Sequence, residues 1–339
     1  MFKRYSKITI LLVAVCVFFS VDIANARADE VVVYVSEDQV FSEPILKDFE
    51  KEAGIKVLAV YDTEEAKGTG VMNRLIMEKN NPQADVYWAN EPIRAVVLKQ
   101  SGITMPYISP NAKDIPDDFK DPEGYWTCFS SRARVLVVNN KVSIKPSSIL
   151  AYTDPQYKGK SVITNPLFGT TTVQVASLFT IWGEDHTKSF MDEMKKNGVK
   201  ISTNNGESAD LVAAGEFDFS LVDSDDVISR IRQGKPIEMI FPDQKDGEAG
   251  CLLVPNAVVI IKNARHFENA KKLVDYLLSK ETEQKLAFAD CAQIPLHSGV
   301  KTPSDLPKIE NIKFMKIDYT KVAKKLQEIQ AYLKEWVGY

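Results

Sequence analysis

The chain has 339 residues and a formal net charge of −4 at neutral pH. This mildly acidic balance argues against nucleic acid or an anionic membrane surface as the main partner. The length is enough for two lobes that each bury a core of their own.

Residues 1–26 follow the three-part plan of a secretory signal. Basic residues precede an apolar stretch from Ile8 to about Phe19, and small residues suited to cleavage follow it. The apolar stretch is short for a membrane span, and a single uncleaved anchor is the alternative interpretation. We expect residues 1–26 to be removed and the mature chain to be exported.

Residues 30–102 alternate between strands rich in β-branched residues and helices with apolar residues on one side. The expected strands are 30–38, 55–61 and 84–89, and the expected helices are 40–54, 68–80 and 90–102. This alternation predicts βαβ units and a parallel sheet.

Two long extended segments, 125–140 and 251–263, flank a second unit of alternating helices and strands. They suggest that the chain crosses out of one lobe and later crosses back. We therefore predict an α/β fold with two lobes, in which two mixed sheets are flanked by helices and two crossover strands form the hinge. Residues 27–139 and 251–339 would build lobe one, and residues 140–250 would build lobe two.

Carboxylates follow three of the predicted strands. These acids are Glu37 and Asp38, then Glu91, then Asp223, Asp225 and Asp226. Ligands of open α/β sheets bind at the carboxyl ends of strands, and in a two-lobed protein those ends face each other across a cleft. The acids are therefore candidates for binding a metal ion, an ammonium group or sugar hydroxyls. For any single one of them, a solvated loop is the alternative.

A predicted helix start has the chemistry of an anion site. Gly169, Thr170 and Thr171 stand where free backbone N–H groups, hydroxyls and the positive end of the helix dipole converge. An ordinary threonine cap is the alternative interpretation.

The first crossing segment adds positive charge. At strand spacing, Ser130, Arg132 and Arg134 share one face. Arginine is suited to forked contact with phosphate or carboxylate, although at least one of the two is expected to bridge lobe-one acids. We expect Thr170 and Thr171 to face Ser130 and Arg132 across the cleft.

Cysteine and histidine spacing indicates neither zinc nor nucleophilic catalysis. Outside the signal the cysteines are Cys128, Cys251 and Cys291, and one disulfide plus one free thiol is the simplest arrangement for an oxidising compartment. The chain has no GxSxG, no HExxH and no clear nucleophile–histidine pair. We therefore expect no enzyme activity and no cofactor.

The order of the motifs resembles that of the periplasmic solute-binding proteins of ABC importers, and most closely the ferric-ion-binding family. The motifs in order are YVSED, FEKEAGIKV, ADVYWANE, YWTCFSSRARVLVVNN, NPLFGTT, DLVAAGEFDFSLVDSDD and PNAVVIIKNARHFENAKKLVDYLLS. The resemblance implies a type II periplasmic-binding-protein fold that closes on its ligand like a hinge. It implies a periplasmic protein that takes a small molecule or ion to an ABC importer permease in the inner membrane, and we expect a monomer.

The resemblance also implies roles for single residues. Glu91 matches an iron-binding glutamate of the family, and an iron-binding histidine falls on or near Asp38. The paired iron-binding tyrosines fall at Asp225 and Asp226, so both tyrosines are absent here. Carboxylates are also hard oxygen ligands, so a metal remains an alternative.

The anion site and the hinge of the family have counterparts as well. The helix start matches Gly169–Thr171, a Ser-x-Arg-x-Arg segment matches Ser130–Arg134, and an asparagine matches Asn205 or its neighbour. Because Cys291 precedes a segment that lies near the hinge in similar proteins, we favour a Cys251–Cys291 disulfide.

Three hypotheses for function follow. The first is a binding protein for a small anionic solute, such as a phosphorylated sugar or an aminophosphonate. Its anionic group would lie on the threonine helix and the arginine strand, and its hydroxyl or amino end on the acids. The second is a binder of ferric iron or another metal with an anion, using Asp38, Glu91, Asp225 and Asp226. The third is a secreted hydrolase that uses paired carboxylates or a metal.

Overall fold

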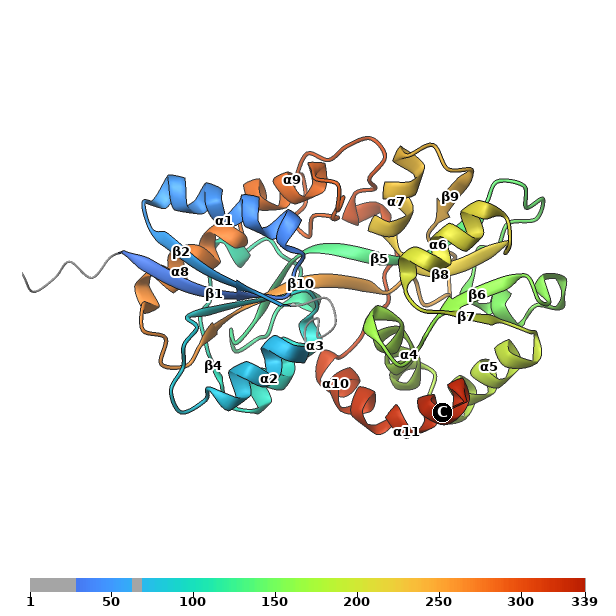
Figure 1. Cartoon of the computed structure of the whole chain (residues 1–339), viewed down its shortest axis with the longest axis horizontal. Coiled ribbons are helices and arrows are strands. Elements are labelled where there is room, and N and C mark those ends of the chain that lie inside the picture. Colours follow the sequence, from blue (N-terminus) through green and yellow to red (C-terminus); the bar gives the residue numbers. More distant parts are fainter. Residues whose placement is uncertain (1–28, 63–68, 339) are drawn as a thin grey trace, which may run out of the picture.

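The computed structural model describes residues 29–62 and 69–338, and the predicted signal at residues 1–26 lies outside them. The molecule has two halves that lie side by side along its longest axis (Figure 1). Among the described residues, no helix is both long and apolar enough to cross a membrane.

The first half is built on the N-terminal βαβ units, as the sequence predicts. Its strands are β1 (Glu30–Val35), β2 (Lys56–Tyr61), β3 (Val86–Ala89) and β4 (Thr104–Met105). Its helices are α1 (Gln39–Ala53), α2 (Thr69–Met77), α3 (Pro92–Gln100), α8 (Phe267–Leu277) and α9 (Lys280–Phe288). Strands β2, β1 and β3 are parallel in that order, because each helix returns the chain to the same end of the sheet. Helices lie on both faces of these strands (Figure 1).

The second half repeats this plan with the middle of the chain. Its strands are β6 (Ser161–Thr164), β7 (Lys200–Ser202), β8 (Phe219–Asp223) and β9 (Ile237–Ile240). Its helices are α4 (Gly169–Ile181), α5 (Glu184–Lys196), α6 (Asn205–Ala214) and α7 (Ser224–Arg232). Strands β8, β6 and β7 are parallel. Short 3-10 helices lie at Pro110–Ala112, Asp117–Phe119, Ile149–Thr153, Pro155–Tyr157 and Ile309–Asn311.

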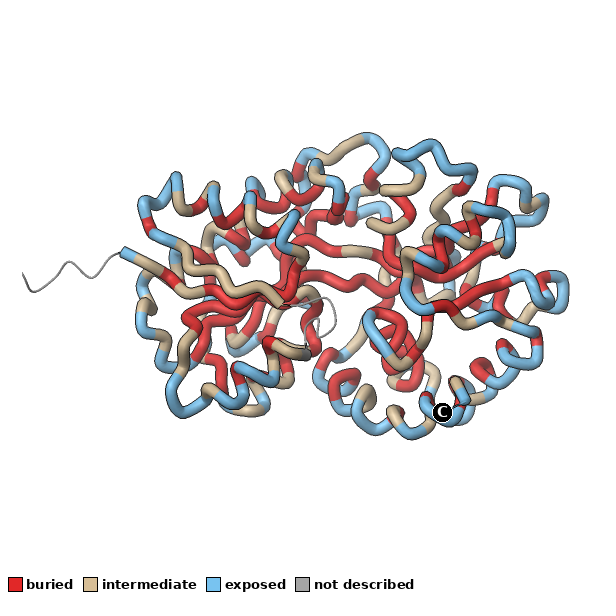
Figure 2. The backbone as a smooth tube through the Cα atoms, in the orientation of Figure 1, coloured by how far each residue is buried: buried red, intermediate tan, exposed pale blue. Residues whose placement is uncertain are grey.

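Strand β5 (Thr127–Asn139) belongs to both halves. Up to Ala133 it pairs antiparallel with β10 (Leu253–Ile261), and from Arg134 onward it pairs with β8 and β9. Strand β10 in turn pairs with β3 of the first half. Both long strands are almost wholly buried (Figure 2). The pairing of β5 thus changes partner between Ala133 and Arg134, six residues before the lobe boundary expected at 139.

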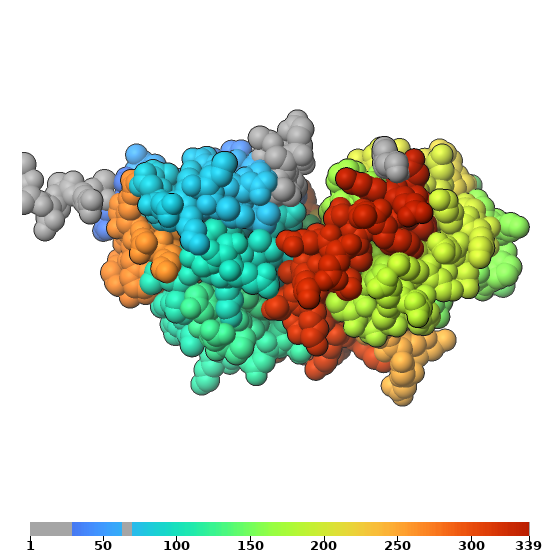
Figure 3. All heavy atoms as spheres, turned by 90° about the horizontal axis from the view of Figure 1, so that it is seen from below, coloured from blue at the N-terminus to red at the C-terminus, as the bar shows by residue number. Residues whose placement is uncertain are grey.

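The C-terminal segment bridges the two halves. Helix α10 (Tyr319–Glu328) packs on α3 of the first half and on α4 of the second. Helix α11 (Gln330–Val337) packs on α5, where the indole nitrogen of Trp336 donates to the carbonyl of Met191 at 3.0 Å. Figure 3 shows these last helices between and across the halves. The end of the chain therefore contacts the second half, although residues 251–339 were all expected in lobe one.

The expected Cys251–Cys291 disulfide is absent. Both residues, and Cys128, are buried free thiols. The backbone N–H of Cys251 donates to Lys313 at 3.1 Å, whereas the thiol of Cys291 lies 3.5 Å from the carbonyl of Leu286 in α9. The disulfide prediction is wrong because each cysteine packs against a segment whose position the spacing of cysteines does not reveal.

Candidate functional site

A buried ion pair lies where β5 changes partner. Arg134 of β5 stands directly across the strand ladder from Asp223, the last residue of β8. The guanidinium Nη1 lies 2.8 Å from Asp223 Oδ1, and the side chains are 0% and 5% exposed. A charge pair removed from water in this way needs further hydrogen bonds around it to be tolerated.

Side chains from two helices supply those bonds. Arg134 Nη1 donates to Thr170 Oγ1 and Asn205 Oδ1, both at 3.0 Å, and Nη2 donates to Thr171 Oγ1 at 3.2 Å. Thr170 donates in turn to Asp223 Oδ2 at 3.0 Å. The start of α4, the start of α6 and the end of β8 therefore meet around one guanidinium. The two threonines contact Arg134, where we expected Arg132.

Arg132 lies next to this cluster and is 12% exposed. Its Nη1 is 3.7 Å from Asp223 Oδ2, and its Nη2 donates to the carbonyl of Asn90 at the end of β3. Arg132 and Arg134 thus both approach Asp223, as expected from their alternation on a strand. Through Asn90 and Asp223, Arg132 contacts both halves of the molecule.

Ser130 does not share that face. It forms a β-bulge with φ of +40°, since Pro255 pairs with Ser131 while Asn256 already pairs with Phe129. A bulge adds one residue and breaks the two-residue alternation of side chains. Ser130 is fully buried, and its N–H donates to Glu283 in α9 at 2.7 Å.

Carboxylates from both halves surround Arg132. Burial by itself would lower the pKa of its guanidinium, but the negative charges of nearby acids raise it above the usual arginine value. The acids that act on it, in order of their effect, are Asp223, Glu37, Asp225 and Asp38. Glu37 and Asp38 precede α1, and Asp223 and Asp225 flank the start of α7. Sequence-distant acids predicted at strand ends are thus gathered around one arginine.

Asp225 and Asp226, in the first turn of α7, differ in their partners. Burial raises the pKa of both carboxyls, and the charge of Asp223 adds to the rise. Arg132 opposes it for Asp225, and Arg230 opposes it for Asp226. Asp226 Oδ1 lies 3.2 Å from Arg230, whereas Asp225 Oδ1 is buried without a hydrogen-bond partner among the described residues.

Glu91 caps a helix in this structure. Its carboxylate accepts the N–H groups of Ile93 at 2.6 Å and Arg94 at 3.3 Å, and it pairs with the Arg94 guanidinium. Proline at the first helical position is a local signal that a helix starts at Pro92, which puts Glu91 at the cap position. The preceding residue, Asn90, was not predicted, yet its Oδ1 is buried and finds no partner within the described parts of the chain.

The predicted metal ligands Asp38, Glu91, Asp225 and Asp226 do not form a cluster of three or more among the described residues. Across residues 29–62 and 69–338, no three histidine, cysteine, aspartate or glutamate side chains gather as a metal site would require. Asp38 stands at the cap position of α1, and its side chain does not cap the helix.

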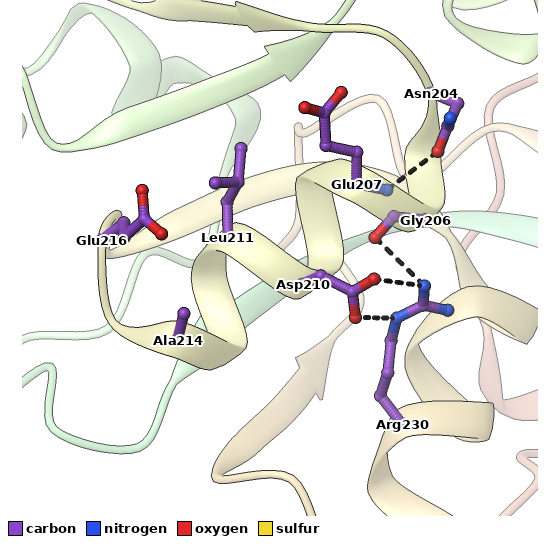
Figure 4. Close-up of a pocket in the computed structure, with 8 residues that line it drawn as sticks. All are labelled: Asn204, Gly206, Glu207, Asp210, Leu211, Ala214, Glu216 and Arg230. Carbon is purple, nitrogen blue, oxygen red and sulfur yellow. Dashed lines mark hydrogen bonds and ion pairs between the residues drawn. The ribbon is translucent and has the colours of Figure 1, made fainter.

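An open hollow of about 540 Å³ adjoins the site at α6 (Figure 4). It is lined by Asn204, Gly206, Glu207, Asp210, Leu211, Ala214, Glu216 and Arg230. Arg230 donates to Asp210 Oδ1 at 2.9 Å and to the Gly206 carbonyl at 3.1 Å, in addition to its contact with Asp226. A Cβ on Gly206 would come within 2.9 Å of Arg230, so a side chain there would displace this arginine. Of the predicted site residues, only Asn204, the neighbour given as the alternative to Asn205, lines the hollow.

Two α/β halves, joined by two long strands and with charged side chains of both halves meeting at the crossing, define a binding protein of the type II periplasmic class. The chain belongs to the family of bacterial extracellular solute-binding proteins, whose family model matches residues 45–313. The members of this family are binding proteins, and the chain is a solute-binding protein similar to the ferric-ion-binding group.

Relatives with curated names agree with this family. The chain is 26% identical to iron uptake protein A1 of Synechocystis over 289 residues, 80% of this chain and 78% of the relative. It is also 26% identical to a putative 2-aminoethylphosphonate-binding periplasmic protein of Salmonella typhimurium over 262 residues, 76% and 74% of the two chains.

Solved structures confirm the fold. A Trichodesmium protein in complex with iron and citrate superposes with a TM-score of 0.80 at 24% identity, covering 91% of this chain and 99% of that one. The periplasmic binding protein AfuA of Actinobacillus pleuropneumoniae, with fructose-6-phosphate bound, gives a TM-score of 0.75 at 24% identity and covers 91% and 98%.

Proposed function

We propose that this protein is the periplasmic component of an ABC importer and binds a small solute with an anionic group at one end and an amino or hydroxyl group at the other. Family membership supports the transport role. A relative named for 2-aminoethylphosphonate and a fold neighbour with bound fructose-6-phosphate each concern a solute of this kind. Delivery to a membrane permease follows from the class, and we propose that the protein acts as a monomer.

The observation that carries the proposal is a set of unpaired polar atoms around Arg132. Among the described residues, Asp225 Oδ1, Asn90 Oδ1 and Arg132 Nε are buried without a hydrogen-bond partner. Buried polar atoms are nearly always paired, so these three atoms are poised for a partner that the described residues do not supply. The two acceptors come from different halves. An ammonium group, with three donors, or a pair of hydroxyls would satisfy both as the halves close.

The start of α4 suits the anionic end of the solute. Phe168, at the cap position, provides no side-chain bond to the first turn, and free N–H groups at a helix start favour an anion. Thr170 in that turn and Arg132 both lie beside Asp223 Oδ2, at 3.0 and 3.7 Å. In this proposal the anionic end of the solute lies at the start of α4, and its amino or hydroxyl end lies at Asp225 and Asn90.

Calorimetry tests this proposal, and mass spectrometry of the freshly purified native protein would identify a retained solute. We expect 2-aminoethylphosphonate or a sugar phosphate to bind the wild type, and Asp225→Asn to weaken binding by about tenfold or more. Glu216→Gln, an exposed acid of the same half, is the matched control and should bind normally. Wild-type affinity in Asp225→Asn would show that this carboxylate does not bind the solute.

A metal–anion binder is the second candidate. Burial and mutual repulsion raise the pKa of the Asp226 carboxyl, and a bound cation would relieve that repulsion. A relative named as an iron uptake protein is consistent with it. Ferric titration with and without phosphate or carbonate separates the candidates, since only this one requires iron for the anion to bind. A secreted hydrolase has no support from the site, and a turnover assay with phosphate esters and glycosides would test it.

A further inference from the structure

A carboxylate occupies the subsite proposed for the anionic group. Asp223 touches Arg134 at 2.8 Å and accepts the hydroxyl of Thr170 at 3.0 Å. It also lies 3.7 Å from Arg132. Two arginines and the start of a helix are groups that usually bind an anion. Here the buried carboxylate of Asp223 already contacts them.

The charge balance of the subsite follows from this contact. Arg134 is fully buried and is neutralised by Asp223, so its charge is not available to a ligand. Arg132 is shared among several carboxylates. A ligand oxygen that carries full negative charge would therefore meet Asp223 as a like charge, with little uncompensated positive charge to offset the repulsion.

The hydrogen-bonding capacity of Asp223 also disfavours a fully deprotonated ligand oxygen. An ionised carboxylate only accepts hydrogen bonds, and each of its oxygens can accept two. Oδ1 receives Arg134, and Oδ2 receives the Thr170 hydroxyl, which leaves an acceptor position on Oδ2. A ligand oxygen next to Oδ2 must therefore donate a proton.

Oxyanions differ in whether one of their oxygens carries a proton that it can donate. Phosphate esters lose their second proton near a pKa of about 6, and close to neutral pH part of the population keeps one P–OH group. Sulfate and sulfonate groups have no such proton. We propose that Asp223 makes this site selective for oxyanions that carry a proton, phosphates and phosphonates, against sulfates and sulfonates of the same shape. The inference rests on the proposed function, because it concerns the anionic end of the same solute.

A matched pair of ligands tests the proposed selectivity for oxyanions that carry a proton. 2-Aminoethylphosphonate and 2-aminoethylsulfonate share the amine and the spacer, and differ only in the oxyanion. By calorimetry near about pH 6 we expect wild-type protein to prefer the phosphonate by about tenfold or more, since a site built to accept a proton rejects an analogue without it. The preference should shrink toward about pH 8, where the phosphonate is mostly deprotonated.

The sulfonate is also the control for pH. The charged groups that face Asp223 are Arg132 and Arg134 of β5 and Asp225 and Asp226 of α7. Protonation of these acids changes the affinity for both ligands, so the ratio of the two affinities isolates the proton of the phosphonate. Equal affinities near about pH 6, or a ratio that does not change with pH, would overturn the inference.

A variant adds an independent measurement. In Asp223→Asn the like charge is gone and the amide can donate, so the sulfonate should bind more tightly and the ratio should approach one. A ratio that stays at the wild-type value in a folded variant would contradict the inference. If the variant does not fold, the wild-type ratio and its pH dependence still decide.

If the wild-type protein binds neither amine, the failure concerns the proposed solute and not the inference about Asp223. It refutes the proposed solute, and the inference is then decided with inorganic phosphate and sulfate, which engage only the anionic subsite. Phosphate should raise the midpoint of thermal unfolding more than sulfate at equal ionic strength. Equal shifts would overturn the inference.

Discussion

The carboxylate of Asp223 and the guanidinium of Arg134 lie 2.8 Å apart at the point where β5 leaves β10 for β8. Both residues face each other across the strand ladder, and two threonines and an asparagine from α4 and α6 complete the cluster. The pair therefore holds together the start of α4 and the strand that joins the two halves.

Arg134→Met should lower the free energy of unfolding by about 3–5 kcal/mol, because it leaves Asp223 buried without its partner. Urea unfolding followed by circular dichroism measures this. Arg232→Met is the control: Arg232 pairs with Asp305 near the surface, and its loss should cost less than about 1 kcal/mol. Similar losses in the two variants would show that the buried pair does not stabilise the fold in this way.

Arg132→Ala should weaken binding of the solute and leave the fold intact. Its guanidinium is partly exposed and is surrounded by acids of both halves, so we expect binding of the solute to weaken by about tenfold or more. The fold should be retained, as judged by circular dichroism. Unchanged affinity would assign Arg132 a structural role instead.

Asp225→Asn should stabilise the empty protein near neutral pH while it weakens binding. Burial raises the pKa of the Asp225 carboxyl in the folded state, so ionisation of this group opposes folding. A raised folded pKa means that the associated stability is present at low pH and is lost as the pH rises through that pKa. We expect the variant to gain about 1 kcal/mol at neutral pH, and the gain to vanish in acid, where both proteins are uncharged at this position. Thermal unfolding as a function of pH measures this, and a gain that persists in acid would contradict it.

Glu283 should be essential to the packing of α9 against β5. This fully buried carboxylate accepts the N–H groups of Ser130, Leu296 and His297 at 2.7–2.9 Å, and lies 2.8 Å from the His297 ring. Glu283→Gln brings amide hydrogens against these donors, and we expect a loss of about 2–4 kcal/mol in urea unfolding. Glu281→Gln, an exposed acid of the same helix, should change stability little.

His297 gives the stabilisation by Glu283 a pH dependence. Burial would lower the pKa of its imidazole, but the bond to Glu283 and the negative charge of Glu283 raise it. The protonated form therefore stabilises the fold below the ordinary histidine pKa, and this stabilisation is lost as the pH rises through the raised value. The loss should be absent in Glu283→Gln. A pH profile that is identical in the variant and the wild type would exclude this coupling.

The cysteines should behave as three buried thiols. The experiment uses a chain that lacks residues 1–26. In the native protein a thiol reagent should modify none of Cys128, Cys251 and Cys291. After unfolding without reductant it should modify all three. Burial raises the pKa of Cys251 to about 12, which also slows its reaction. A single reactive thiol after unfolding would indicate a disulfide.

Local patterns in the sequence were enough to predict the architecture. The alternation of β-branched strands with amphipathic helices gives βαβ units because side-chain periodicity and chain return are local properties. The same holds for the acids at the end of β8 and for the threonines at the start of α4, whose positions follow from where an element begins or ends. Pro92 carried a local signal for a helix start, from which the cap position of Glu91 follows by the same reasoning.

Only the tertiary structure decided how these residues are used. Arg132 and Arg134 lie on the same face of β5, so the sequence does not distinguish them. The register between β5 and β8 places Arg134 against Asp223. The same register leaves Arg132 among the acids of both halves. The bulge at Ser130 lies where the partner strand has Pro255, which has no N–H for the ladder. The separation of Cys251 from Cys291 and the unpaired oxygen of Asn90 likewise depend on segments far away in the chain. Contacts between distant segments are set by packing and register, and no local periodicity encodes them.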